Sequence, residues 1–486
     1  MWLQALLDLL MVGGGEALTH GLANAIAPNR LRFRNTLSGE LEDFEPINGT
    51  VKLYNCGPTV YDRQHIGNLR GAVLADVARR TLKAWGYKVK HVSNITDVGH
   101  LVSDADEGED KMEAAAKKMG RHSQEIAEEI TQLYFADLDL LGIDRRQMQF
   151  PRATHYIGEQ IALVKTLLQK GYAYRISDGV YFDTAKFPGY GKLGGLSIGG
   201  QQAGARVEEN KEKKHPHDFA LWKLSSAGEK REQEWPSPWG VGFPGWHLEC
   251  TAMIFKLLGR QIDIHMGGED LAPIHHNNEI AQAEAATGKQ FVRYWMHNAF
   301  ITIEGKKVSK SLGNTIYLTQ LADRGLSPRA LRYLYLTAHY RSPMNFTWGA
   351  AESADQALKR LTRAYLEAPK GGRADGDFLI RFYGAIADDL NTPQALALIW
   401  EHIKTLNRPT LAEADKILGL GLAQARPSSK LAVKEELPEG IRALLEAREA
   451  ARKHKDFEKA DEMRKEIESA GYELTDTPEG AQISKK

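Results

Sequence analysis

Two cysteines, a histidine pair and a glutamate are the residues of this chain best suited to holding a soft metal ion. Cys56 ends the stretch YNC, and Cys250, the only other cysteine, lies far downstream in GWHLEC. In LAPIHHNNEIAQ, His275 and Glu279 are four residues apart and share one face of a helix. His276, three residues from Glu279, fits as well, so spacing does not decide between the histidines. Thiolate, imidazole and carboxylate are zinc ligands, although two unrelated buried thiols would explain the cysteines more simply.

Two further motifs could bind a polyphosphate. Residues 65–68, HIGN, stand where a helix is expected to begin, and the free N–H groups of a helix N-terminus bind phosphate. Residues 307–311, KVSKS, place two lysines between glycines, which can close over phosphates as a mobile loop. Taken singly, each motif is also typical of an ordinary surface turn or solvated loop. Their order, one after the first strand and one late in an α/β region, favours a nucleotide site.

The segments that must position these residues indicate a parallel sheet. Residues 51–61 predict a strand, 68–85 a helix with Asn68 as its N-cap, and 88–96 a second strand. A strand–helix–strand unit favours parallel pairing. The strand expected near 260–270 leads into a helix predicted for 275–286. Residues 166–240 are predicted to be irregular, the chain from about 325 onward to be helical, and 446–467 to form one charged amphipathic helix.

Composition limits the classes of protein to which this chain could belong. The chain has 486 residues with 63 basic and 63 acidic side chains, so any binding of nucleic acid must come from local patches. Two cysteines make no disulfide scaffold and favour a reducing compartment. The apolar run at the N-terminus carries Asp8 and ends in glycines, unlike a signal peptide or a membrane span. We therefore expect a cytoplasmic monomer without membrane attachment.

The two phosphate-binding motifs resemble those of the class I aminoacyl-tRNA synthetases, His-Ile-Gly-His and Lys-Met-Ser-Lys-Ser. This chain departs from them at Asn68 and Val308. The resemblance implies a catalytic role for His65, Asn68, Lys307 and Lys310, and ATP binding by these residues with Gly67 and Ser309. Mg²⁺ is expected to accompany the ATP.

The blocks CGPTVYD, NITDVGH, DFALWK, GWHLEC, HHNNEIAQ and KVSKSLGN are similar, in this order, to those of the cysteinyl-tRNA synthetases. The resemblance extends from about Leu31 to the C-terminus. It implies one Zn²⁺ per chain on Cys56, Cys250, His275 and Glu279, so the family pattern selects the first histidine. Pro273-Ile274 replaces the usual Phe-Pro, and Asn277 replaces an acid.

The resemblance also implies the reaction and further contacts. The cysteine carboxylate would attack the α-phosphate of ATP, giving cysteinyl-adenylate and pyrophosphate, and cysteine would pass to the 3′ end of tRNA(Cys). Besides Cys56, the amino-acid site would include Thr96, Trp246 and Asp270, which could equally be a strand-end Thr, a core Trp and a loop-capping Asp. The tail would read the anticodon through Arg452, Phe457 and Asp461, although charged helices of this kind are often merely solvated.

The expected fold is α/β: a Rossmann-like parallel-sheet catalytic domain split by an insertion, then a helical bundle and a small C-terminal anticodon-binding unit. The boundaries predicted are a disordered N-terminal extension at 1–30, the first catalytic half at 31–165, a connective insertion at 166–240, the second half with the zinc ligands and KVSKS loop at 241–325, a helical tRNA-binding bundle at 326–425, a linker at 426–440 and the anticodon-recognition unit at 441–486.

Two other functions remain compatible with the catalytic motifs. One is a cysteine ligase that joins activated cysteine to an amino sugar; such enzymes lack a tRNA-reading tail, and the tail present here argues against this. The other is a non-catalytic RNA-binding relative, which would tolerate damage to the metal ligands or the lysine loop; neither is damaged in this sequence.

Overall fold

The computed structural model describes residues 30–99, 111–193, 210–225, 231–308, 313–425, 437–454, 456–477 and 480–485. They divide into two compact units. The first comprises the described residues up to 361 together with 368–422, and the second comprises 362–367 with the described residues from 423 onward. Apart from Arg30, the expected extension lies outside the described residues, as does the linker up to residue 436.

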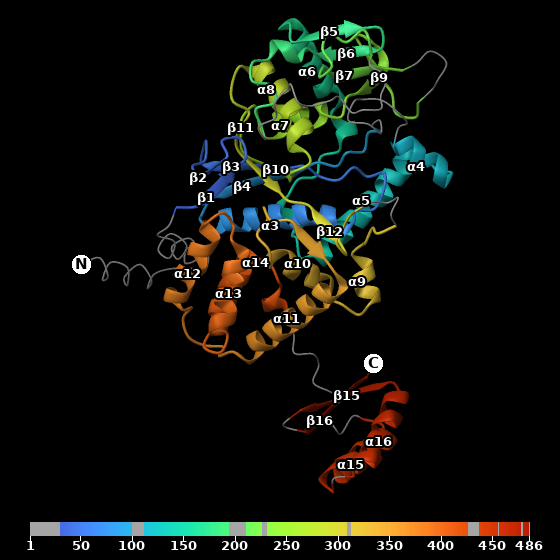
Figure 1. Cartoon of the computed structure of the whole chain (residues 1–486), viewed down its shortest axis with the longest axis vertical. Helices are drawn as coiled ribbons and strands as arrows, with labels where there is room; N and C mark the ends of the chain where they lie inside the picture. Colours follow the sequence, from blue (N-terminus) through green and yellow to red (C-terminus); the bar gives the residue numbers. More distant parts are fainter. Residues whose placement is uncertain are drawn as a thin grey trace, which may run out of the picture. The chain divides into compact units, whose positions relative to one another are not determined.

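A four-stranded parallel sheet is the centre of the first unit (Figure 1). Its order is β11 (Val292–Asn298), β10 (Ile262–Gly268), β3 (Thr50–Asn55) and β4 (Lys88–Ser93), with parallel pairing throughout. Leu53 pairs with Ile264 on one side and with His91 on the other. The α/β fold with a parallel sheet that the sequence predicts is therefore confirmed.

The strand order creates a natural binding position. From β3 the chain continues to β4 on one side, whereas from β10 it continues to β11 on the other. Ligands of open α/β sheets bind beyond the carboxyl ends of strands where the order reverses in this way. Here that point lies between β3 and β10, and Cys56 directly follows β3.

The helix after β3, α3 (Ile66–Ala84), begins earlier than predicted. Its N-cap is His65, whose Nδ1 accepts a hydrogen bond from the N–H of Gly67 at 3.0 Å. The prediction of Asn68 as N-cap was wrong, because an imidazole nitrogen here takes the role usually filled by a short oxygen-bearing side chain. The helix packs between the sheet and the helices α10 (Pro328–Leu336) and α14 (Arg408–Leu418) (Figure 1).

The stretch predicted to be irregular instead contains a five-stranded antiparallel sheet, so that prediction was wrong. The order is β5 (Ala173–Ile176), β6 (Gly179–Phe182), β7 (Phe219–Leu224), β9 (Gly240–Pro244) and β8 (Trp235–Ser237). Its apolar side chains form one core with those of α6 (Ile157–Gln169), including Phe182 and Trp222. The strands are short, and residues 183–218 separate β6 from β7, which hides the sheet from a local reading of the sequence.

The rest of the first unit is mainly helical, as predicted for the chain beyond 325. The helices there are α10 (Pro328–Leu336), α11 (Trp348–Glu367), α12 (Gly376–Ala387), α13 (Thr392–His402) and α14 (Arg408–Leu418). A parallel pair of β12 (Ile301–Ile303) with β14 (Met344–Phe346), flanked by β13 (Lys306–Lys307), was not foreseen. The remaining elements are β1 (Arg32–Asn35), β2 (Glu40–Asp43), α4 (Lys111–Met119), α5 (Ser123–Leu140), α7 (Leu248–Leu257), α8 (Asn277–Thr287) and α9 (Thr319–Asp323).

The second unit contains two helices and a hairpin, where the sequence predicted one helix. α15 (Glu439–Lys453) ends before His454, and α16 (Phe457–Ser469) begins after Asp456, whose side chain accepts from the N–H of Lys459. This local cap starts a new helix and so breaks the predicted one. The hairpin pairs β15 (Tyr472–Thr477) with β16 (Gly480–Lys485), and a small apolar core includes Ile467 and Leu474.

Across the ranges given above, the structure contains no helix with the length and apolarity that a membrane span requires.

Candidate functional site

The four predicted metal ligands come from separate elements that meet beyond the carboxyl ends of β3 and β10. Cys56 follows β3, Cys250 lies in the first turn of α7, His275 lies in the π-helical turn η4 (Ala272–His276), and Glu279 lies in the first turn of α8. One ligand atom from each lies within 4.8 Å of all the others. Cys250, His275 and Glu279 are buried, and Cys56 is partly exposed. The fold therefore gathers residues that are up to 223 positions apart (279 − 56).

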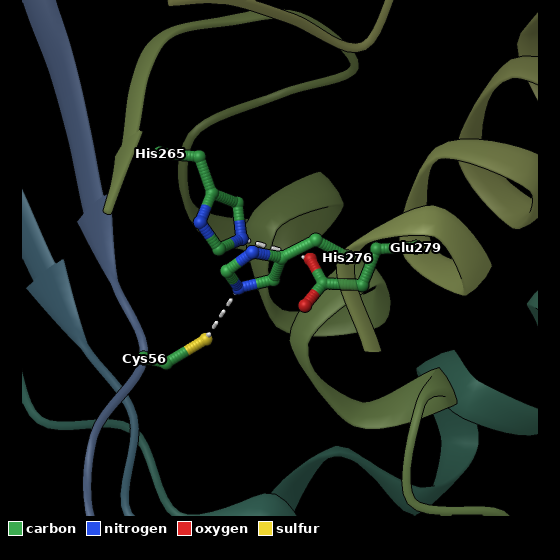
Figure 2. Close-up of side chains that lie close together, drawn as sticks. All are labelled: Cys56, His265, His276 and Glu279. Atoms are coloured by element: carbon green, nitrogen blue, oxygen red, sulfur yellow. Dashed lines mark hydrogen bonds and ion pairs between the residues drawn. The ribbon is translucent and has the colours of Figure 1, made fainter. Parts of the chain in front are cut away.

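The same centre contains a second group of candidate ligands, Cys56, His265, His276 and Glu279. Their ligand atoms also lie within 4.8 Å of one another. Figure 2 shows the ring of His276 facing the Cys56 thiol and the ring of His265 bonded to the Glu279 carboxylate. His276 Nε2 lies 3.4 Å from Cys56 Sγ. Proximity therefore does not choose between His275 and His276, just as their spacing in the sequence does not.

Glu279 lies between two histidines. Its Oε2 is 2.8 Å from His265 Nε2, and its Oε1 is 2.8 Å from His275 Nε2. Burial alone would raise the pKa of Glu279, but the charges of His265 and His275 outweigh it and lower the pKa to about 2. Burial would likewise lower the pKa of His275, but Glu279 and Cys250 raise it to about 10. The carboxyl group is thus ionised at neutral pH.

The two thiols favour their protonated forms. The hydrogen bond with Cys56, burial and the charge of Glu279 raise the pKa of Cys250 well above its usual value. For Cys56, the hydrogen bond with Cys250 lowers the pKa, but burial and the carboxylates of Glu279 and Asp270 outweigh it and raise the pKa. A metal cation among these groups would reverse the preference, because it stabilises thiolates.

The donor set fits a zinc ion. Zinc in proteins takes thiolate, imidazole and carboxylate ligands, usually four in number in structural sites and three with an open position in catalytic ones. Each of the two groups offers four such donors around one point. His276 suits this role because burial, followed by the charges of neighbouring histidines, lowers its pKa well below the usual value and keeps the ring neutral.

The predicted amino-acid contacts lie near the ligand residues or are linked to them. The ring of Trp246 lies 4.7 Å from that of His275. Asp270 is exposed and lies close enough to Cys56 to affect its pKa. Thr96 is buried, and its hydroxyl donates to Glu249 Oε2 at 3.2 Å. Since Glu249 directly precedes Cys250, Thr96 lies one hydrogen bond away from the segment that carries a metal ligand.

The nucleotide motifs are brought together only in part. His65 and Gly67 form the start of α3, and Asn68 Nδ2 donates to Gln64 Oε1 at 2.8 Å. Lys307 is exposed at the end of β13. Ser309 and Lys310 lie outside the described residues. The segment that follows them returns to the helix start, because the N–H of Ile66 donates to the carbonyl oxygen of Ile316 at 2.9 Å.

Sequence reasoning missed several histidines of this centre. His265 stacks on Trp295 with ring centroids 4.4 Å apart, and His247 Nδ1 lies 2.9 Å from His275 Nδ1. His297 Nε2 lies 2.7 Å from His276 Nδ1. The signal available was a histidine inside each of two strands that read as buried, IDIHMGG and VRYWMHN, because buried parallel strands are otherwise continuous apolar runs.

The predicted anticodon residues lie on the helices of the second unit. Phe457 is the first residue of α16, and 61% of it is exposed. Asp461 follows one helical turn later and is also exposed. Arg452 is exposed near the end of α15. An aromatic ring with a carboxylate one turn away is an arrangement that can stack on a base and bond its edge.

Comparison with known proteins covers most of the chain. Residues 43–356 match the family described as tRNA synthetases class I (C) catalytic domain, 381–424 match the DALR domain, and 434–483 match the cysteinyl-tRNA ligase anticodon binding domain. Cysteine–tRNA ligase 1 of Burkholderia lata is 47% identical over 460 residues, which cover 93% of this chain and 96% of that protein. Cysteine–tRNA ligase of Thermus thermophilus is 44% identical over 472 residues, covering 92% and 97%.

Solved structures agree in fold. Methionyl-tRNA synthetase of Mycobacterium tuberculosis in complex with methionyl-adenylate matches with a TM-score of 0.52 at 15% identity, covering 82% of this chain and 94% of that one. LeuRS of Agrobacterium radiobacter K84, in a ternary complex with tRNA and LeuAMS, matches with a TM-score of 0.54 at 12% identity, covering 78% and 84%. With the catalytic and anticodon-domain matches in the same chain and relatives matched over nearly their whole length, this protein belongs to the cysteine–tRNA ligase family of class I tRNA synthetases.

Proposed function

We propose that this chain activates L-cysteine with ATP to cysteinyl-adenylate and pyrophosphate, and transfers the cysteine to the 3′ end of tRNA(Cys). The observation that carries the proposal is the convergence of two thiols, an imidazole and a carboxylate within 4.8 Å at the reversal point of the parallel sheet. The sequence similarity to cysteine–tRNA ligases supports it. The match of residues 434–483 to an anticodon-binding domain disfavours an amino-sugar ligase.

Cys56, Cys250, His275 and Glu279 would hold one Zn²⁺. When bound, zinc supplies a strong preference for the sulfur of cysteine over the oxygen of serine, because it favours soft thiolate ligands. A pocket that senses shape alone separates such similar substrates by only about 1–3 kcal/mol. Trp246, Asp270 and Thr96 would complete the amino-acid site, and the ring of Trp246 would cover the face beside His275.

ATP would bind at the start of α3. The N-terminal N–H groups of this helix suit phosphate, and Gly67 allows a flat ring to approach the backbone. His65, Asn68, Lys307, Ser309 and Lys310 would contact the nucleotide, with Mg²⁺ on its phosphates. Their work would be positioning the reactants and stabilising the charge that develops on the phosphoryl oxygens.

For the RNA, we infer that the second unit reads the anticodon through Arg452, Phe457 and Asp461. The helices after 326 would contact the body of the tRNA, and the boundaries proposed from the sequence would separate these roles. The scarcity of cysteines supports a cytoplasmic location. A monomer would suffice because a single chain contains both the catalytic and the anticodon-domain matches, which sedimentation can check.

The experiment that tests this function is pyrophosphate exchange with each amino acid in turn, followed by tRNA charging. We expect exchange with cysteine alone, its loss after chelation, its return with zinc, and charging of tRNA(Cys). Exchange that needs another amino acid would refute the substrate. Cysteine activation without any tRNA charging would instead favour the amino-sugar ligase.

A further inference from the structure

Glu279 presents a separate oxygen to each of the two groups of candidate ligands. Oε1 faces His275 of the first group, and Oε2 faces His265 of the second, each at 2.8 Å from the ring Nε2. Cys56 is also common to both groups. Its Sγ lies 3.4 Å from His276 Nε2 (Figure 2). The shared thiol and carboxylate therefore border two possible positions for a metal ion.

In the second group, His276 is oriented by hydrogen-bonding contacts of the ring nitrogen that does not face Cys56, as is usual for ligand histidines. His276 Nδ1 lies 2.7 Å from His297 Nε2, and His297 Nδ1 lies 2.8 Å from the hydroxyl of Thr36. This chain of contacts leaves His276 Nε2 to face Cys56. Gly267 provides the space for the ring, because a Cβ at that position would lie 2.6 Å from His276 Cε1.

His265 is fully buried and turns its Nε2 toward the shared carboxylate. Its Nε2 contacts Glu279, whereas its Nδ1 has no hydrogen-bond partner among the described residues. The nitrogen that faces the second group is therefore Nε2, which lies against the carboxylate shared by both groups. One thiolate, two imidazoles and a carboxylate are donor types that zinc accepts.

We propose that the centre holds its zinc ion in either of two positions, one formed by Cys56, Cys250, His275 and Glu279 and the other by Cys56, His265, His276 and Glu279. This inference rests on the proposed zinc binding. Because Cys56 and Glu279 belong to both groups, the positions are filled one at a time and each chain binds one ion. The first position has two sulfur ligands and the second has one.

The test is the zinc content and the number of sulfur neighbours, measured by X-ray absorption on the full chain. Cys250→Ala with His275→Ala removes the donors found only in the first position. We expect this variant to retain about one zinc, as a structural four-ligand site does, with one sulfur neighbour at about 2.3 Å. Adding His276→Ala should then weaken zinc binding at least tenfold, in line with the loss of a metal-binding group.

His91→Ala is the matched control, because His91 is a buried histidine of the same sheet that belongs to neither group. It should leave zinc affinity unchanged in both backgrounds, and circular dichroism would check folding. A folded double variant without zinc, or one whose zinc is insensitive to His276→Ala, would overturn the second position. If the double variant does not fold, Cys250→Ala alone serves in the same comparison. A wild-type chain that binds no zinc would instead refute the proposed zinc function itself.

Discussion

Asp76 of α3 and Arg332 of α10 form an ion pair in which both side chains are completely buried, with Oδ2 2.7 Å from Nη2. Arg332 also donates from Nε to the carbonyl oxygen of Leu418 at 2.6 Å. Arg79 and Arg80 pair with the same carboxylate from within α3. The helix that begins at the proposed phosphate site is therefore fixed to the helices beyond residue 326 by one buried carboxylate.

Replacing Asp76 by Asn should lower the free energy of unfolding by about 3–5 kcal/mol, because the charge of Arg332 would remain buried without its partner. Urea unfolding measures the loss. Asp139→Asn is the matched control, since Asp139 pairs with Arg145 on the surface at 2.7 Å and should contribute less than about 1 kcal/mol. If both substitutions lowered the free energy of unfolding equally, the buried pair would contribute no more than a surface pair.

The contribution of Asp76 should also depend on pH. Burial would raise the pKa of this carboxyl group, but the charges of Arg332, Arg80 and Arg79 outweigh it and lower the pKa to about 2. The unfolded value is about 3.9, so the group stabilises the fold above that pH and loses this contribution as the pH falls toward 2. The stability difference between the wild type and Asp76→Asn should therefore be constant near neutrality and shrink below about pH 4. A difference that grows in acid would contradict the lowered pKa.

Replacing Cys250 by Ser removes one thiolate from the centre. Removal of a residue that only hydrogen-bonds to a metal ligand typically costs about 10–100-fold in activity. Because Cys250 is itself a proposed ligand, the rate of cysteine activation should fall by more than this. Discrimination against serine should fall with it, because sulfur preference would come from the metal. The ratio of kcat/KM for the two amino acids in pyrophosphate exchange measures this, with the KM for ATP as the internal control. An unchanged ratio would place substrate selection elsewhere.

Local patterns were enough to predict the parallel sheet and the ligand types. The strand predicted at 88–96 contains β4 (Lys88–Ser93), and the helix predicted at 275–286 agrees with α8 (Asn277–Thr287) to within two residues. Whether Cys56 and Cys250 approach each other could not follow from spacing, because their meeting depends on β10 pairing with β3. The family resemblance supplied that step.

Features that depend on distant partners were missed. The antiparallel sheet of β5 to β9 consists of strands of three to six residues, and β7 begins far along the chain from β6, so no single window shows the whole sheet. The role of His265 depends on its contact with Glu279, which lies on another element. The break between α15 and α16 could have been predicted locally. Asp456, a good N-cap residue, directly precedes the second helix.

Replacing Lys307 or Lys310 by Ala should slow adenylate formation by about 10²-fold, the scale of losing one group that stabilises a transition state. Affinity for cysteine should change little, because the thiol centre is separate. Lys306→Ala is the matched control, as Lys306 is the neighbour of Lys307 in β13 and is also exposed. Single-turnover kinetics measures the step. A large loss of cysteine affinity at normal turnover would assign the loop to the amino acid.

Replacing Phe457 by Ala should weaken tRNA charging while leaving cysteine-dependent pyrophosphate exchange intact. The ring is 61% exposed at the start of α16, so its removal costs little packing, whereas stacking on a base contributes about 1–3 kcal/mol. The kcat/KM for tRNA should therefore fall about 5- to 150-fold, since about 1.4 kcal/mol corresponds to a factor of ten. Asp461→Asn should act on the same parameter and relax the choice of anticodon base. Glu466→Ala, an exposed change elsewhere on α16, should have no such effect. If charging is normal in Phe457→Ala, the anticodon is read by other residues.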